Sequence, residues 1–320
     1  MNVAASGRNV GAARLTLRLH RLELVALGGV LVALAAAAFM VAGWLDAIGY
    51  GPSCIDPTGT QPVSVSCEAL SRRFYDLQGS LASPIAGLLV TLAYGAAALL
   101  GVAVVGRELE RGTSRLAWSI APSRRRWYLG RLVPVLVALA AITFLAGIAT
   151  DRLAAASAPG VDVTRAFDGF GSRGGLVASR AILVFAIAVA TGTMLGRVLP
   201  ALMLAAVLSW ASLSYGSQIH DRILLGEAVA VPADQDQRGA RFFDQRFRLP
   251  DGQLVGWEVM QQLDPPPPDG EWIPKYPMVN LVVPGERYRA VEAREAAALG
   301  TGTLVWLGFA GLVVSRRRPG

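Results

Sequence analysis

Few side chains in this sequence have a type and spacing that could do metal or nucleotide chemistry. The two histidines, His20 and His220, have no metal-ligating companion at helical spacing, and His220, beside Asp221, is expected to be solvated. The single lysine, Lys275 in IPKYP, is followed by tyrosine, whereas a phosphate-binding loop needs Lys-Ser or Lys-Thr after a glycine-rich turn. We therefore expect no catalytic residue, cofactor or metal here, and any ATP hydrolysis to belong to another polypeptide.

A second group of polar side chains lies in residues 106–132, GRELERGTSRLAWSIAPSRRRWYLGRL, which contain seven arginines. Their spacing predicts an amphipathic helix of about three turns that ends before Pro122. One face holds Leu109, Gly112, Thr113, Leu116 and Ile120, and the other holds Glu108, Arg111 and Arg115. The arginines and aromatics of SRRRWY are typical of a membrane edge, so a plain membrane anchor is one interpretation.

The elements that position these residues are membrane-spanning helices. Hydrophobic residues make up 53% of the 320 residues, charged residues 17%, and mean hydropathy is +0.45. Six apolar runs are long enough to cross a bilayer, and with no water there to satisfy backbone groups each must be a helix. The runs are 22–44, 81–105, 132–149, 175–195, 199–215 and 296–314. We predict an all-α polytopic membrane protein with six transmembrane helices.

The arginines also predict orientation. Segments before the first span, between spans two and three, between four and five, and after six hold 15 of the 30 basic residues. They hold only two acidic residues, Glu108 and Glu110, whereas the opposite segments hold 20 of the 23. By the positive-inside tendency, both termini face the cytoplasm. Because the basic residues are spread over four membrane-edge segments, the net charge of +7 does not indicate a nucleic-acid partner.

This topology divides the chain into four parts. Residues 1–21 are a cytoplasmic basic leader with an interfacial helix, and 22–219 contain five spans and the basic loop 106–131. Residues 220–295 form an extracytoplasmic subdomain, in which RFFDQRFRLP and GQLVGWEVM are expected to be strands. Residues 296–320 are the sixth span and a cytoplasmic basic tail.

Two further observations depend on the topology. Cys54 and Cys67 both fall in the first outside loop, where an oxidising environment permits a disulfide; two free thiols are the alternative. Glu23, Glu292 and Glu295 stand at span edges, and the absence of a mid-membrane acid argues against an ion-coupled carrier.

The order of residues in GRELERGTSRLAW, followed by SRRRW, resembles a known family. It is similar to the cytosolic loop between spans two and three of ATP-binding-cassette type-2 (ABC-2) permeases of the actinobacterial type. The leader RLTLRLHRLEL, the run RAFDGFGSRGGLVASRAILVFAIAVATGTMLGRVLPAL and the junction PGERYRAVEAREAAAL resemble that family more weakly. The cysteine loop and residues 221–280 do not, which leaves the substrate open.

The resemblance implies an exporter permease subunit in the cell membrane, without catalytic residues of its own. In such permeases the loop helix is a coupling helix that sits in a groove of a cytosolic ATPase. The ATPase-coupling positions carried over are Glu108, Glu110, Arg111, Gly112, Thr113, Arg115, Arg124, Arg126 and Trp127. Glu108 and Glu110 would give charged contacts, Gly112 would permit close approach of another backbone, and Arg124, Arg126 and Trp127 would fix the helix against the membrane.

The partners implied are a cytosolic ABC ATPase, a second permease that would be an identical copy, and membrane lipids. An amphipathic drug, an antibiotic or a lipid-like molecule would suit a path lined by apolar helices. The alternative is a polytopic membrane scaffold or sensor in which residues 221–295 bind an extracytoplasmic partner and 106–132 is only an anchor.

Overall fold

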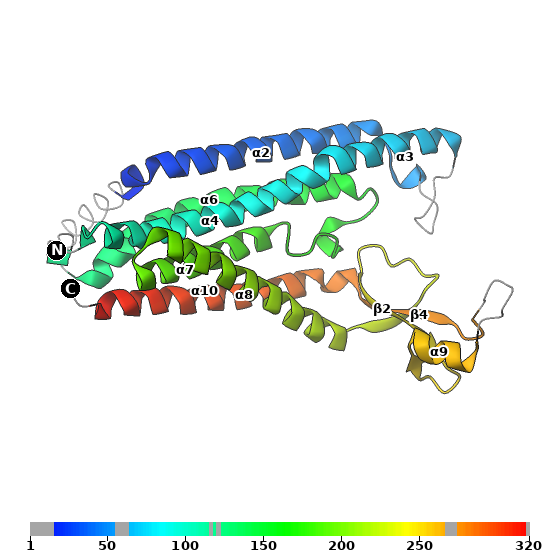
Figure 1. The fold of residues 1–320 in the computed structure, drawn as a ribbon. Coiled ribbons are helices and arrows are strands. Elements are labelled where there is room, and N and C mark those ends of the chain that lie inside the picture. The colour runs from blue at the N-terminus through cyan, green and yellow to red at the C-terminus, as the bar shows by residue number, and fades with distance from the viewer. Residues whose placement is uncertain (1–15, 55–63, 115–117, 120–122, 266–273, 318–320) are drawn as a thin grey trace, which may run out of the picture.

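Among the residues that the computed structural model describes (16–54, 64–114, 118–119, 123–265 and 274–317), six helices are long and apolar enough to cross a membrane (Figure 1). They are α2 (Arg21–Ile48), α4 (Ser83–Glu110), α6 (Arg124–Ser157), α7 (Gly175–Leu195), α8 (Val198–Gly226) and α10 (Tyr288–Arg316). The six predicted spans are confirmed as helices. Most extend beyond the predicted bounds, and α6 begins early enough that Pro134 lies inside it.

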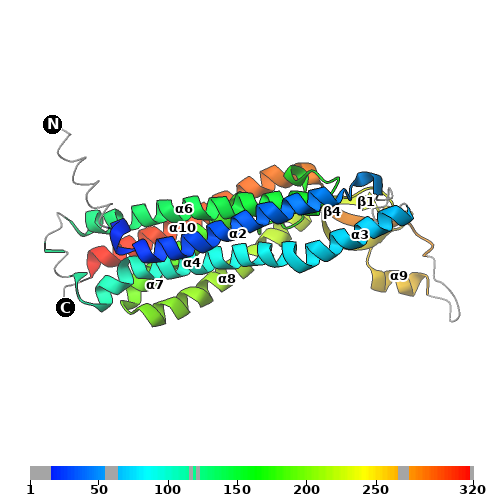
Figure 2. The ribbon, with the colours of Figure 1, turned by 90° about the horizontal axis from the view of Figure 1, so that it is seen from above.

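The helix α7 occupies the centre of the bundle and packs against α4, α6, α8 and α10 (Figures 1 and 2). It carries almost no polar face, and most of its residues are buried. Small residues let neighbouring backbones approach closely, as is common between membrane helices. A Cβ atom at Gly101 of α4 would lie 2.6 Å from the carbonyl oxygen of Phe185 in α7. Any larger side chain at Gly101 would therefore force the two helices apart.

The bundle has two chemically different ends (Figure 1). The first turn of α2, the last turns of α4 and α10, and the first turn of α6 lie together at one end, which we call the arginine-rich end. At the other end, the sheet end, α3 (Val65–Leu77) continues through the π-helical turn η2 (Gln78–Ala82) into α4. A disulfide joins Cys54, in the 3-10 turn η1 (Pro52–Cys54), to Cys67 in the first turn of α3.

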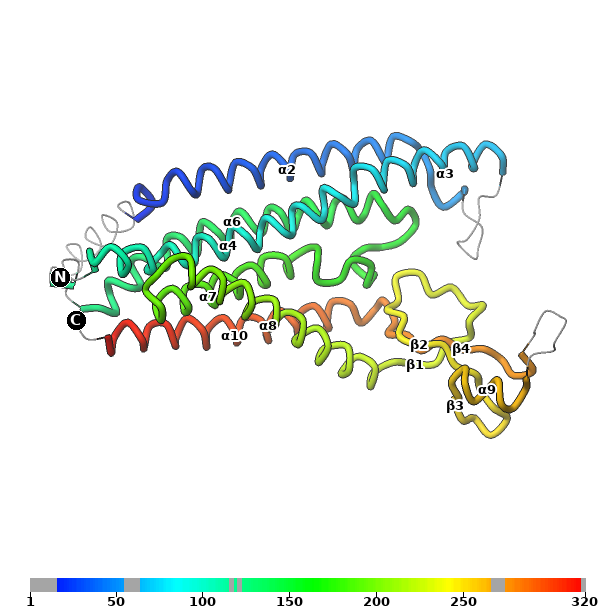
Figure 3. Tube along the Cα trace, viewed as in Figure 1, coloured from blue at the N-terminus to red at the C-terminus, as the bar shows by residue number. Residues whose placement is uncertain are grey.

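A four-stranded antiparallel sheet extends beyond the helices (Figure 3). Its order is β1-β4-β2-β3, and it comprises β1 (Val229–Pro232), β2 (Arg241–Arg248), β3 (Leu254–Val255) and β4 (Met278–Val283). The central strands pair in the register Gln245 to Asn280. Phe247, Val255 and Met260 form its small core.

The predicted strand RFFDQRFR is confirmed as β2, but GQLVGWEVM is only in part a strand. The chain is extended only at Leu254–Val255, and α9 (Trp257–Leu263) begins after Gly256. The run that follows Gly256, WEVMQQL, is rich in good helix formers, and this local preference overrides the strand pattern. Two short 3-10 turns, η3 (Val163–Arg165) and η4 (Gly285–Arg287), complete the connections at this end.

Candidate functional site

The two carboxylates of the basic stretch lie on the last turn of α4, and they point to different helices. The Glu108 carboxylate pairs with Arg131 of α6 at 2.8 Å, and both side chains are largely buried, at 19% and 15% exposed. The Glu110 side chain is exposed, and its Oε2 accepts a hydrogen bond of 3.3 Å from the backbone N–H of Val198 at the start of α8. Glu108 therefore ties two helices together inside the protein, whereas Glu110 is accessible from outside.

The predicted continuous helix over 109–120 is interrupted at Gly112. Arg111 caps α4, and Gly112 takes a left-handed conformation with φ of 69°. A Cβ atom at Gly112 would meet nothing within 4 Å, so this glycine is required by the backbone turn rather than by a close approach. The Thr113 hydroxyl donates a 3.3 Å hydrogen bond to the Glu108 carbonyl and steadies the turn. Arg115 lies outside the described residues.

An aromatic cluster stands beside this turn, at the start of α6. The Arg124 guanidinium lies 4.8 Å from the ring centroid of Trp118, and Trp118 meets Trp127 edge to face at 5.9 Å. Arg124 also donates hydrogen bonds to the carbonyl oxygens of Ser315 and Arg317, where α10 ends. These contacts fasten the first turn of α6 to the last turn of α10.

Arg126 has a different place from Arg124. Its backbone N–H donates 3.2 Å to the side chain of Ser123, which caps the N-terminus of α6, while its own side chain is exposed. The structure thus divides the predicted coupling residues. Glu108, Arg124 and Trp127 are at least partly buried and contact neighbouring helices or their ends. Four residues form an exposed turn, and the first of them also accepts a hydrogen bond from α8: Glu110, Arg111, Gly112 and Thr113.

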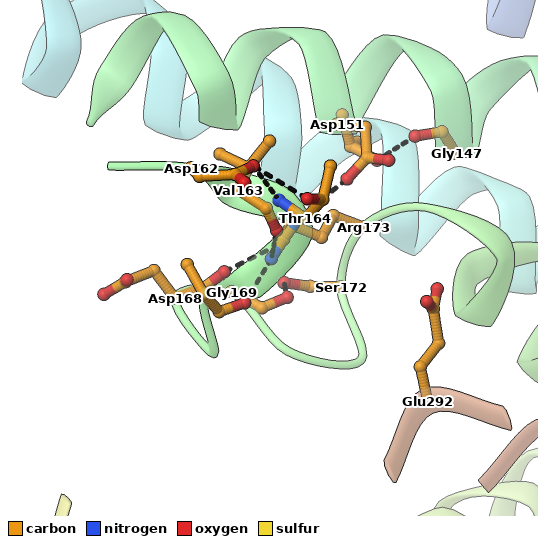
Figure 4. A network of polar contacts seen from close by, with 12 residues as sticks. Gly147, Asp151, Asp162, Val163, Thr164, Asp168, Gly169, Ser172, Arg173 and Glu292 are labelled. Carbon is orange, nitrogen blue, oxygen red and sulfur yellow. Dashed lines mark hydrogen bonds and ion pairs between the residues drawn. The ribbon is translucent and has the colours of Figure 1, made fainter. Parts of the chain in front are cut away.

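At the sheet end, Arg173 is the centre of a buried polar network (Figure 4). Its side chain is 3% exposed and pairs with Asp151 of α6 at 2.8 Å. It also donates 2.8 Å to the carbonyl of Asp168, 2.7 Å to that of Val163, and a further bond to that of Ala166. One arginine thereby ties three carbonyls of the connection between α6 and α7 to Asp151 of α6.

A second polar cluster at this end joins α7, α8 and α10. Arg180 donates two hydrogen bonds, of 3.0 and 2.5 Å, to Oε1 of Glu295, and the His220 Nε2 lies 3.8 Å from Oε2 of the same carboxylate. The Tyr94 hydroxyl of α4 is buried nearby and has no hydrogen-bond partner among the described residues. Among the described residues, no three or more His, Cys, Asp or Glu side chains are grouped so that they could hold a metal ion.

This second cluster corrects one sequence-based expectation and adds a contact to another. His220 is not solvated: its side chain is 12% exposed and stacks on Phe170, with ring centroids 5.3 Å apart. Glu295 stands at the span edge, as its position indicates, but it is 11% exposed and paired with a charge on α7. Arg180, the one charge in an otherwise apolar run of 21 residues, was the available signal.

Comparison with known proteins gives one family match. Residues 22–217, more than half of the 320, match the model of a family described as ABC-2 membrane transporter related. The match includes the stretch 106–132 and ends within α8, before the sheet and α10. No curated protein and no solved structure matches the chain.

Proposed function

We propose, from the premise that this chain belongs to the ABC-2 membrane transporter related family, that it is the membrane subunit of an ATP-driven exporter powered by a separate cytosolic ATPase. Family membership and six apolar helices make the chain a multi-pass membrane permease of an ABC transporter. The proposal adds the docking site, the direction of transport and a location in the cell membrane. The exposed turn Glu110–Thr113, inside the matched region, is the observation that carries it.

The exposed turn suits a cytosolic partner for physical reasons. Glu110 and Arg111 present opposite charges outside the bundle, and charge-assisted hydrogen bonds are stronger than neutral ones. Behind the turn, the Glu108–Arg131 pair and the Arg124 contacts join α4, α6 and α10. A force that the partner exerts on the turn would therefore be transmitted to α4, α6 and α10. In this proposal Glu110, Arg111 and Thr113 contact the ATPase, and Glu108, Arg124 and Trp127 position the turn.

Two further partners belong to the proposal. Large apolar side chains on one face of α8 are 62–70% exposed and are suited to lipid acyl chains: Leu199, Met203, Val207 and Trp210. A second, identical permease would complete the translocation path, and native mass spectrometry in mild detergent would show it as a dimer. The proposed substrates are amphipathic molecules, including drugs and antibiotics.

The first test is affinity purification from the native membrane in mild detergent, with mass spectrometry of the retained proteins. An ATPase in stoichiometric amount is expected, and its absence would overturn the coupling proposal.

The second test reverses the charges of the exposed turn. Glu110→Arg with Arg111→Glu should lower ATPase stimulation by about tenfold, the equivalent of about 1.4 kcal/mol of interaction energy, without changing insertion. Arg72→Glu is the matched control, because Arg72 is an exposed arginine at the sheet end. Equal ATPase stimulation by the charge-reversed turn variant and by Arg72→Glu would place the docking site elsewhere.

A further inference from the structure

A cavity of about 300 Å³ lies between α7, α8 and α10 at the sheet end of the bundle. Its wall is mostly apolar: Leu183, Leu213, Ile219, Ile223 and Leu299. Its polar part is the Arg180–Glu295–His220 cluster together with Ser212, Ser217 and Arg294. A small apolar cavity with a few convergent polar groups is the usual form of a small-molecule site.

Two polar atoms of residues that line this cavity are buried and have no hydrogen-bond partner among the described residues. Arg180 gives both of its hydrogen bonds to Oε1 of Glu295, which leaves Oε2 unpaired. The Nε2 of His220 is also buried and unpaired, 3.8 Å from Oε2, which is too long for a hydrogen bond. Buried polar atoms are seldom left without a partner, so this pair is suited to receive one polar group.

The charges around the cavity indicate that this group is neutral. The Arg180 guanidinium compensates the Glu295 carboxylate, and Arg294 is paired at 2.5 Å with Glu227, which follows α8. Neither an ammonium nor a carboxylate would find an uncompensated countercharge here. A hydroxyl can donate to Oε2 of Glu295 and at the same time accept from Nε2–H of His220.

We propose that this cavity binds an uncharged amphipathic molecule, with its hydroxyl between Glu295 and His220 and its apolar body against α8 and α10. That the bound molecule is also the transported one rests on the permease function proposed above. Binding itself does not, and it can be measured without an ATPase.

The test uses three photoreactive probes of equal chain length that carry the same diazirine: a long-chain alcohol, the matching alkylammonium and the matching alkane. Each is cross-linked to the purified full-length protein in lipid nanodiscs, and the labelled peptides are mapped by mass spectrometry. We expect the alcohol to label residues 212–223 and 294–299 saturably, at lower concentration than the other two, and unlabelled alcohol to compete. Stronger labelling by the ammonium, or equal labelling by the alkane, would overturn the proposal.

Variants assign the effect to the polar pair. His220→Phe keeps the stacking on Phe170 but removes Nε2, and loss of one hydrogen bond of about 1 kcal/mol should raise the half-saturating concentration about fivefold. His220→Gln should recover part of this loss. Tyr215→Phe is the control, because Tyr215 lies on the same helix with an exposed side chain. An unchanged half-saturating concentration in monodisperse His220→Phe would overturn the assignment to the polar pair. Failure of the alcohol to label wild type would overturn the binding proposal. It would not bear on the ATPase partner, which is tested separately by purification.

Discussion

Two buried arginines at the sheet end contrast with two exposed arginines at the arginine-rich end. At the sheet end, Arg173 and Arg180 are buried and donate hydrogen bonds to acceptors inside the protein. At the arginine-rich end, Arg111 and Arg126 have exposed side chains. The supply of acids explains the difference, because only Glu23, Glu108 and Glu110 of the 23 acidic residues lie at the arginine-rich end. Where acids are plentiful, buried charge pairs hold loops and helices together; where they are scarce, arginine side chains lie at the surface, which is where the proposed partner would meet them.

The largest effect is expected from Arg173→Met. The change removes the hydrogen bonds that join Asp151 to the loop carbonyls. Asp151 is 45% exposed and can be solvated, so the main cost comes from the loop carbonyls that lose their donor, at about 1–3 kcal/mol for each unsatisfied group. We expect little monodisperse protein after heating, as measured by size-exclusion chromatography. Arg173→Lys should fall between wild type and Arg173→Met, because it keeps the charge but not the fork of donors.

The matched comparison for Arg173 is an arginine of the other end. Arg125, at the start of α6, has an exposed side chain, and Arg125→Met should leave thermal stability close to that of wild type. Equal losses in Arg173→Met and Arg125→Met would show that the two ends do not differ in the way that burial indicates.

The second effect concerns the disulfide at the sheet end. Replacing both Cys54 and Cys67 by serine releases a loop whose ends are 13 residues apart. A loop of about 15 residues corresponds to about 3 kcal/mol of stabilisation. We expect a lower melting temperature and loss of the mobility difference between reduced and non-reduced protein on gels. Unchanged mobility of the wild-type protein on reduction would contradict the bond.

Sequence reasoning succeeded where the signal is local. The bounds of α7 follow directly from an apolar run between Gly174 and Gly196, which both have positive φ and fix where the helix begins and ends. The charge pairs could not be predicted in this way. Arg180 and Glu295 are 115 residues apart, and only the packing of α7 against α10 brings them together.

The predicted coupling residues show the same limit. The pattern of acids, glycine and arginines in residues 106–132 resembles the ABC-2 family, and this stretch lies inside the region that matches the family model. The pattern could not separate side chains that pair inside the protein from those that are exposed. Glu108 and Glu110 differ because each carboxylate meets a different neighbouring helix, α6 for Glu108 and the start of α8 for Glu110. The packing of the bundle decides this, and the sequence of the loop does not show it.

A smaller effect is expected from Gly112→Ala at the arginine-rich end. A residue with a Cβ costs about 1–2 kcal/mol in the left-handed conformation that Gly112 adopts. Because the site is exposed and nothing lies within 4 Å, the strain should alter the turn rather than unfold the bundle. We expect reduced ATPase stimulation at nearly unchanged melting temperature. Gly112→Asn should be milder, since asparagine tolerates this conformation better; equal losses in both would point to a steric cause instead.

The smallest effect distinguishes the ends by pH. A hydrogen bond from Arg294, together with the charges of Arg294 and Arg287, lowers the pKa of the Glu227 carboxyl at the sheet end. A carboxyl whose pKa is lower in the folded protein stabilises the fold at pH values above the ordinary pKa of that carboxyl, and this stabilisation is lost as the pH falls through the pKa of the folded state.

The melting temperature of wild type should therefore exceed that of Glu227→Gln at pH 7. The gap should close as the pH falls below about 4, where carboxyls titrate. The gap itself should be small, because partly exposed ion pairs contribute little. A gap of equal size at both pH values would mean that Glu227 acts through packing. The buried charge pairs of Arg173 and Arg180 would then be the remaining evidence that the sheet end differs from the arginine-rich end.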